Sequence, residues 1–237
     1  QEGSMKVLKK VLIVVLSVIL VAVTGIFALW HNEIATVASI TTIIDQDLSH
    51  DDGYTYEMNV SGDYYFDDFL KQGGVSSDEE LIQFITGNIT KGVIPMTIQT
   101  KEIACSSFTA WTEDQQFVFG RNYDFDETNT AIVHTNPKGR HASVSTIDLQ
   151  FLGIDEKNGI TGIKEKALLL AAPYIPLDGI NDAGVACGIY MTYQGDPPVP
   201  TNQNTEKPDI TSTTLLRLIL DYADNVEEAI ELASQYD

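Results

Sequence analysis

The chain has 237 residues, 43% of them hydrophobic, and carries 14 Lys and Arg against 34 Asp and Glu, which gives a formal net charge of −20. This hydrophobic content argues against a disordered chain, and the length allows one domain together with a targeting segment. The excess of acidic residues argues against nucleic acid as a partner, because phosphate binding requires clustered Lys and Arg.

The N-terminal region is typical of a membrane anchor. We interpret residues 1–4 as the remnant of an expression tag before a natural start at Met5, and the uncharged run 11–30 then follows three lysines, Lys6, Lys9 and Lys10. A helix that rises about 1.5 Å per residue spans the ~30 Å core of a bilayer over such a run. Residues 5–30 are therefore predicted to form a transmembrane helix with the N-terminus in the cytoplasm, because lysines favour that side. A secretory signal that is cleaved off and a buried core helix are the alternatives.

A stalk is expected over residues 31–52, and a folded pro-segment over 53–104. Within the pro-segment, apolar residues alternate with polar ones over 54–60, which predicts a strand. Ser76 or Ser77 precedes three acidic residues and an apolar helical face, so a helix is predicted to begin there.

After Cys105 the pattern changes to short β-rich runs separated by turns, which indicates a second region over 105–237. Strands are predicted over four ranges: 117–119, 131–134, 142–152 and 184–193. Residues 196–208 hold four prolines and are predicted to be a loop. Two helices close the chain, one over 212–222 and one that begins at an Asn225 cap.

The polar turn 112–116 lies between two apolar runs, and it predicts a hairpin that brings Arg121 and Asp124 close to Cys105. A thiolate, not a thiol, attacks a carbonyl, and a nearby guanidinium favours the thiolate. If the chain is cut before Cys105, the new α-amine, with an ordinary pKa of about 7.7–8.0, is suited to shuttling a proton near neutral pH. Asp124 would then hold and polarise that amine.

Cys105 followed by Gly-Arg-Asn-Tyr-Asp over residues 120–124 resembles the pattern of the choloylglycine hydrolase, penicillin V acylase and acid ceramidase-like group of linear amide hydrolases. In that family a strand begins with the nucleophilic Cys, and the Arg and Asp follow at the same spacing as here. A second run, Asp-Gly-Ile-Asn-Asp-Ala-Gly-Val over 178–185, is similar to the family's Asp-Gly-Met-Asn-Glu-x-Gly-Leu turn. The resemblance implies that Cys105 is the nucleophile and that the backbone N–H of Asn181 is a donor of the oxyanion hole.

The resemblance runs from about Tyr54 to the last residue and implies an α+β fold. This fold is an N-terminal-nucleophile αββα sandwich of two antiparallel sheets between helical layers, here preceded by the transmembrane helix. It also implies autocleavage between Ala104 and Cys105. In the family the sandwich continues beyond a helix like 225–236 and supplies a further Asn and Arg, so we expect this chain to be C-terminally truncated or completed by a separate chain. Relatives are often homotetramers or processed heterodimers, so a homo-oligomer and a processed heterodimer are both candidate assemblies.

Together these features predict hydrolysis of a small-molecule, non-peptide amide on the extracytoplasmic side of a membrane. Cys105 attacks the carbonyl, while Arg121 and Asp124 tune and orient it. The cysteines and histidines lack metal-ligand spacing and there is no Gly-rich phosphate loop, so neither a metal nor a cofactor is expected. Acyl transfer to an amine and a non-catalytic, membrane-anchored binding module are the functional alternatives.

Each of these residues also has a purely structural interpretation. Cys105 would then be a buried apolar side chain or form a disulfide with Cys187, which is itself expected in the core. Arg121 and Asp124 would be an ordinary ion pair in a hairpin, and Asn181 would be a turn residue.

Overall fold

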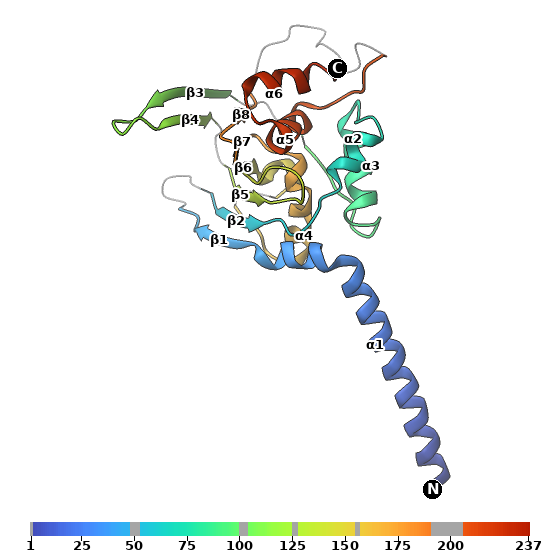
Figure 1. The fold of residues 1–237 in the computed structure, drawn as a ribbon. Helices are drawn as coiled ribbons and strands as arrows, with labels where there is room; N and C mark the ends of the chain where they lie inside the picture. The colour runs from blue at the N-terminus through green and yellow to red at the C-terminus, as the bar shows by residue number, and fades with distance from the viewer. Residues whose placement is uncertain (1, 48–52, 100–103, 125–127, 155–156, 191–205) are drawn as a thin grey trace.

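A six-stranded sheet with the strand order β1-β2-β5-β6-β7-β8 lies at the centre of the fold (Figure 1). The computed structural model describes residues 2–47, 53–99, 104–124, 128–154, 157–190 and 206–237. The strands of this sheet are β1 (Thr41–Ile44), β2 (Thr55–Asn59), β5 (Thr130–Thr135), β6 (Ser143–Asp148), β7 (Asp178–Asn181) and β8 (Ala186–Gly188). Neighbours pair antiparallel, except β2 and β5, which run parallel.

The second sheet is the two-stranded hairpin of β3 (Ala104–Trp111) and β4 (Phe117–Asp124). The helices are α1 (Glu2–Ser39), α2 (Phe66–Lys71), α3 (Asp78–Asn88), η1 (Leu149–Leu152), α4 (Ile163–Leu168), η2 (Leu169–Tyr174), α5 (Ser212–Tyr222) and α6 (Val226–Ala233). The fold is therefore α+β with two sheets, as predicted, although the parallel pair β2–β5 departs from the purely antiparallel sheets that the sequence suggested.

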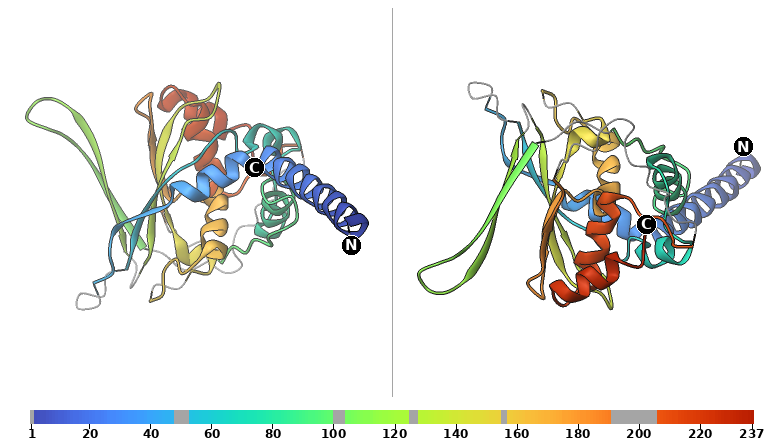
Figure 2. Two further views of the ribbon diagram at one scale, coloured as in Figure 1. Left: turned by 90° about the horizontal axis from the view of Figure 1, so that it is seen from below. Right: turned by 90° about the horizontal axis from the view of Figure 1, so that it is seen from above.

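The core lies between one face of the six-stranded sheet and the helices, while the β3–β4 hairpin stands on the other side of that sheet (Figure 2). Burial alternates along β5, where Ala131 and Val133 are fully buried and their neighbours are less so. This alternation is expected of a strand with only one face in the core. Around Tyr174 the aromatic rings of α2 and α3 gather: Phe66, Phe69 and Phe84.

A buried ionic network holds α5 against the central sheet. Arg217 and Asp221 are one helical turn apart, both fully buried, and the guanidinium donates to the carboxylate at 3.1 Å. Arg217 also donates to the carbonyl of Pro173 at 2.8 Å, and the Tyr64 hydroxyl donates to Asp221 at 2.6 Å. A buried charge is tolerated only when it is paired and hydrogen-bonded in this way.

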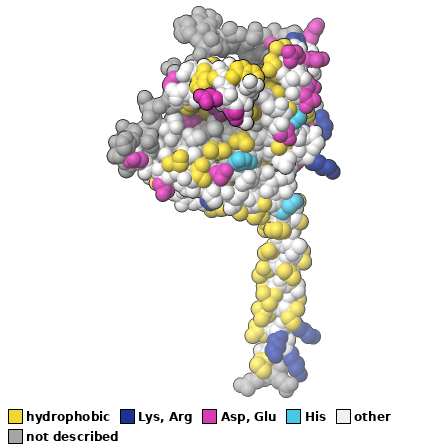
Figure 3. All heavy atoms as spheres, turned by 60° about the vertical axis from the view of Figure 1, so that its left-hand side comes forward, with side chains coloured by type: hydrophobic (Ala, Val, Ile, Leu, Met, Phe, Trp, Pro, Cys, Tyr) yellow, Lys and Arg dark blue, Asp and Glu magenta, His cyan; other side chains and the backbone are white. Residues whose placement is uncertain are grey.

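Most of α1 projects from the body (Figure 1), and apolar side chains cover this projecting part (Figure 3). By length and composition, Gly3–Ser39 is the one helix among the described residues that could cross a membrane. The helix bends at Trp30, whose φ of −125° and ψ of 20° are not helical. The part of α1 before this bend contains most of the uncharged run 11–30, which predicts a membrane anchor or a signal segment.

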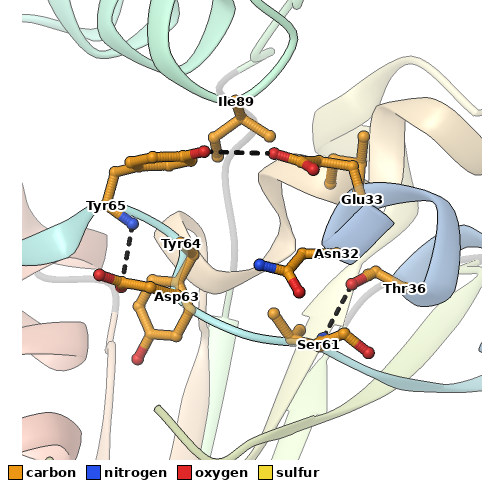
Figure 4. Close-up of a pocket in the computed structure, with 10 residues that line it drawn as sticks. Asn32, Glu33, Thr36, Ser61, Asp63, Tyr64, Tyr65 and Ile89 are labelled. Carbon is orange, nitrogen blue, oxygen red and sulfur yellow. Dashed lines mark hydrogen bonds between the residues drawn. The ribbon is translucent and has the colours of Figure 1, made fainter. Parts of the chain in front are cut away.

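The end of α1 is attached to the body, which differs from the stalk expected over 31–52. Thr36 accepts a hydrogen bond from the backbone N–H of Ser61 at 2.8 Å, and the Tyr65 hydroxyl donates to Glu33 at 3.4 Å (Figure 4). The chain then enters the sheet as β1. The polar residues of 31–47 suggested a solvated stalk, but Glu33 and Thr36 bond to the body. Residues 48–52 of the predicted stalk lie outside the described residues.

Local sequence signals placed several element ends correctly. Ser77 caps α3 by accepting from the N–H of Glu80, and Asn225 caps α6 by accepting from Glu228. The strand expected over 142–152 ends instead at Asp148, because this carboxylate accepts from the N–H of Gln150 and starts η1. Of the strand expected over 184–193, the described residues form only β8. Most of the loop predicted over 196–208 lies outside the described residues.

Candidate functional site

The predicted hairpin forms and determines which residues share a face. Its turn is closed by the backbone N–H of Thr112, which donates to the carbonyl of Gln116 at 2.8 Å. In the resulting register Cys105 lies opposite Tyr123, and Ser107 lies opposite Arg121. Residues two apart along a strand point to the same face, so Cys105 and Arg121 are diagonal neighbours on one face of the hairpin.

Arg121 contacts the Cys105 sulfur. Its Nη2 lies 3.1 Å from Sγ, and only 5% of the Arg121 side chain is exposed to solvent. Nη1 donates to the Asp178 carboxylate at 2.8 Å, and the guanidinium also donates to the backbone carbonyls of Leu177 and Ile189. The guanidinium thereby joins the hairpin to the β7–β8 edge of the central sheet and is held in one orientation.

The surroundings keep Arg121 charged. Burial lowers the pKa of Arg121, but its hydrogen bonds to Cys105 and Asp178 outweigh burial and leave the pKa raised. The rings of Tyr190 and Tyr123 lie over the guanidinium, with centroids 5.2 and 5.5 Å from its central carbon. Burial, followed by the charge of Asp148, raises the pKa of Tyr123, so its phenol stays neutral.

Asp178 belongs to the site, although the sequence alone assigned it no role. Its other carboxylate oxygen accepts from the Thr146 hydroxyl at 2.5 Å, and Thr146 is its register partner on β6. Asp178 is thus fixed on the central sheet and presents one oxygen to Arg121. Its position as the first residue of the Asp-Gly-Ile-Asn run was the signal that could have identified it.

Asp124 lies next to the backbone at Cys105 but not in contact with Arg121. Its register partner is Ala104, so it is level with the peptide bond that precedes Cys105. The side chain is exposed and accepts a hydrogen bond from Asn122. The ion pair of Arg121 is made with Asp178, and no Arg121–Asp124 pair occurs among the described residues.

Asn181 is 5% exposed and holds the turn between β7 and β8. Its backbone N–H donates to the carbonyl of Val185 at 3.1 Å, and its Oδ1 accepts from the Val185 N–H at 2.9 Å. Its Nδ2 donates to the carbonyl of Ala223 at the end of α5, at 2.8 Å. No hydrogen bond joins Asn181 to Cys105 within the described part of the chain, so its oxyanion role stays a prediction.

The two cysteines differ in character. Both are free thiols, so the disulfide between Cys105 and Cys187 is not formed. Burial raises the pKa of Cys187 to about 12, which keeps this thiol protonated at neutral pH. The Cys105 thiol, in contrast, contacts the Arg121 guanidinium. Among the described residues no group of three or more His, Cys, Asp or Glu side chains is placed to hold a metal ion.

The chain matches the model of a known protein family. Residues 105–237, more than half of its length, match the family described as linear amide C-N hydrolases, choloylglycine hydrolase family. The matched range begins at Cys105 and contains Arg121, Asp124, Asp178 and Asn181. Comparison with curated proteins and with solved structures gives no significant match.

Proposed function

Because the chain belongs to the choloylglycine hydrolase family of linear amide C-N hydrolases, we propose that Cys105 is the nucleophile with which it cleaves a non-peptide amide bond. The observation that carries this proposal is the 3.1 Å contact between the Cys105 sulfur and the Arg121 guanidinium. The guanidinium offers a fixed counter-charge to the thiolate, which is the attacking species. Asp178 acts as a positioning residue, since it touches Arg121 and not the sulfur.

The nucleophile is released by cleavage between Ala104 and Cys105. The family match that starts at Cys105 supports this step, as does the position of Asp124 opposite Ala104. After cleavage the Cys105 α-amine, whose ordinary pKa is about 7.7–8.0, takes the thiol proton and later gives it to the leaving amine. Asp124 accepts a hydrogen bond from that amine and orients it.

The chemistry proceeds in two steps. The thiolate adds to the amide carbonyl, the C–N bond breaks as the amine takes up a proton, and a thioester remains on Cys105. Water then attacks the thioester, the C–S bond breaks to release the acid, and the Cys105 sulfur regains a proton from the attacking water through the α-amine. The Asn181 N–H is the proposed oxyanion donor, and one such donor is typically worth about 2.7–4 kcal/mol. In the uncleaved chain this N–H is bonded to Val185, so the role requires that bond to open.

The proposal extends to the fold, the membrane anchor, the substrate class and the assembly. The β3–β4 hairpin is part of the second sheet of an αββα sandwich whose first sheet is the central one. Helix α1 anchors the body on the extracytoplasmic side of a membrane, and cleavage of this helix as a signal would release the body. The substrate is a small-molecule amide, and the assembly is a homo-oligomer or a processed heterodimer.

The test is hydrolysis of N-acyl para-nitroanilides with graded acyl lengths, assayed with the full chain and with Cys105→Ala and Cys187→Ala variants. Release of nitroaniline by wild type and Cys187→Ala, and none by Cys105→Ala, is the expected result. Equal rates in all three proteins would refute Cys105 as the nucleophile.

A further inference from the structure

An apolar groove of about 700 Å³ opens where α1 meets the body. One wall is α1 itself, and the other walls come from the segment after α3, from α4 and from η2. Its apolar lining includes Ile26, Trp30, Ile34, Val93, Ile163 and Leu170. Val93 and Ile163 are 68% and 74% exposed, so the groove has an open, hydrophobic mouth.

The groove is continuous with the proposed membrane span. Ile26 and Trp30 belong to the last turns of the uncharged run, and Ile34 lies one turn further along α1. The projecting part of α1 is covered by exposed apolar side chains up to this point. If that part lies in a bilayer, Trp30 lies at its surface, where Trp side chains concentrate. The mouth of the groove is then at the same depth.

Beyond the bend at Trp30, the last turns of α1 and the residue that follows them are bonded to three parts of the body. Thr36 accepts from the backbone of Ser61, as Figure 4 shows. Lys91, which follows α3, contacts Glu33 at 3.5 Å. Lys166 of α4 donates to the carbonyl of Ile40 at 3.0 Å. These contacts hold the segments that carry Val93 and Ile163 close to the base of the helix.

We propose that an acyl chain of a phospholipid, from the bilayer that holds α1, occupies this groove and seats the body on the membrane surface. The inference rests on the proposed anchoring by α1, and not on the proposed hydrolase activity. A lipid chain fits because the lining is predominantly apolar and continues the surface that α1 presents to hydrocarbon. With a net charge of −20, the chain gains no broad electrostatic attraction to anionic lipid, so apolar contact must supply the docking.

Docking in this way orients the rest of the molecule. Figure 1 and both views of Figure 2 place the β3–β4 hairpin and the projecting part of α1 on opposite sides of the body. The Cys105 hairpin therefore faces away from the bilayer, and its substrate arrives from the aqueous phase.

The two tryptophans of the chain provide reporters for the test, Trp30 in the groove and Trp111 on the hairpin. The full chain is reconstituted in phosphatidylcholine vesicles with brominated acyl chains, which quench tryptophan on contact. The Trp111→Phe variant, which reports on Trp30, is expected to be quenched. The Trp30→Phe variant, which reports on Trp111, is expected to keep its fluorescence.

Single tryptophans introduced into the double Trp30→Phe, Trp111→Phe background then probe the groove itself. Val93→Trp and Ile163→Trp are expected to lose fluorescence about twofold, since apolar interfacial residues insert roughly 5–10 Å into the boundary of headgroups and acyl chains. Ile230→Trp, at a 66% exposed apolar site on α6, is the control and is expected to be unaffected.

Quenching at Trp30 with none at positions 93 and 163 would overturn the docking proposal while leaving the anchor in place. No quenching at Trp30 would overturn the anchor and the docking proposal together. Quenching at Trp111 would overturn the proposed seating of the body, because it would place the hairpin on the bilayer. None of these outcomes depends on amidase activity, so failure of the proposed function is detected separately.

Discussion

Arg121 contacts the sulfur of Cys105 at 3.1 Å although the two residues are not register partners in the hairpin. The contact is diagonal, and the same guanidinium binds Asp178 on the neighbouring sheet. One side chain therefore couples the geometry of the nucleophile to the junction between the two sheets.

Replacing Arg121 by Lys should lower kcat/KM by about 10–100-fold. A single ammonium cannot reach the sulfur, the Asp178 carboxylate and two backbone carbonyls together, and a hydrogen bond to a charged group is worth about 1.5–3 kcal/mol. The measurement is steady-state hydrolysis of the para-nitroanilide that wild type cleaves best. Circular dichroism of the variant controls for folding, and a folded Arg121→Lys protein with wild-type kcat/KM would contradict the assigned role.

The Asp178→Asn variant should lower kcat/KM by about tenfold, a cost typical of residues that orient a functional group through a neighbour. The amide keeps the size of the side chain but removes the charge that orients Arg121. The rate at which iodoacetamide alkylates Cys105 should fall in parallel, which a merely structural role would not produce. Thr146→Val removes the other bond to Asp178 and should have a smaller effect in both assays. An unchanged alkylation rate in Asp178→Asn would argue against positioning.

Alkylation should also separate the two cysteines. Burial raises the pKa of Cys187 to about 12, so its thiol is almost entirely protonated at pH 7.5, and alkylation requires the thiolate. Peptide mass mapping after brief iodoacetamide treatment should show Cys105 labelled much faster than Cys187. Labelling of Cys187 should increase about tenfold per pH unit until the pH approaches its pKa. Faster labelling of Cys187 at pH 7.5 would contradict this assignment.

The buried and exposed ion pairs of the chain should differ sharply in their contribution to stability. Arg217→Met removes a fully buried partner of Asp221, and breaking such a pair typically costs about 3–5 kcal/mol. Lys71→Met breaks the exposed pair with Asp68 and should cost at most about 1 kcal/mol. Urea titrations of both variants in detergent micelles give the free energies of unfolding. A cost for Arg217→Met no larger than that for Lys71→Met would show that the network around α5 is dispensable.

Local signals made the helix caps and the hairpin predictable. Ser77 and Asn225 are capping residues at the start of amphipathic patterns, and the turn over 112–116 defines the register that brings Arg121 to Cys105. These features depend on residues close together in the sequence.

Features that depend on distant contacts were not predictable in the same way. The Arg121–Asp178 pair joins residues of two sheets, and nothing in the spacing of charges revealed it. The attachment of α1 through Glu33 and Thr36 was likewise hidden, because polar residues near an anchor look like a solvated stalk until their partners on the body are known.

The central claim is that Cys105 becomes an N-terminal nucleophile, and intact mass with N-terminal sequencing tests it most directly. The full chain is compared with the Cys105→Ala and Cys187→Ala variants after purification. We predict a fragment that begins at Cys105 in wild type and in Cys187→Ala, and an uncut chain in Cys105→Ala. A chain that remains uncut in all three proteins, or that is cut equally in Cys105→Ala, would contradict autoprocessing at Cys105.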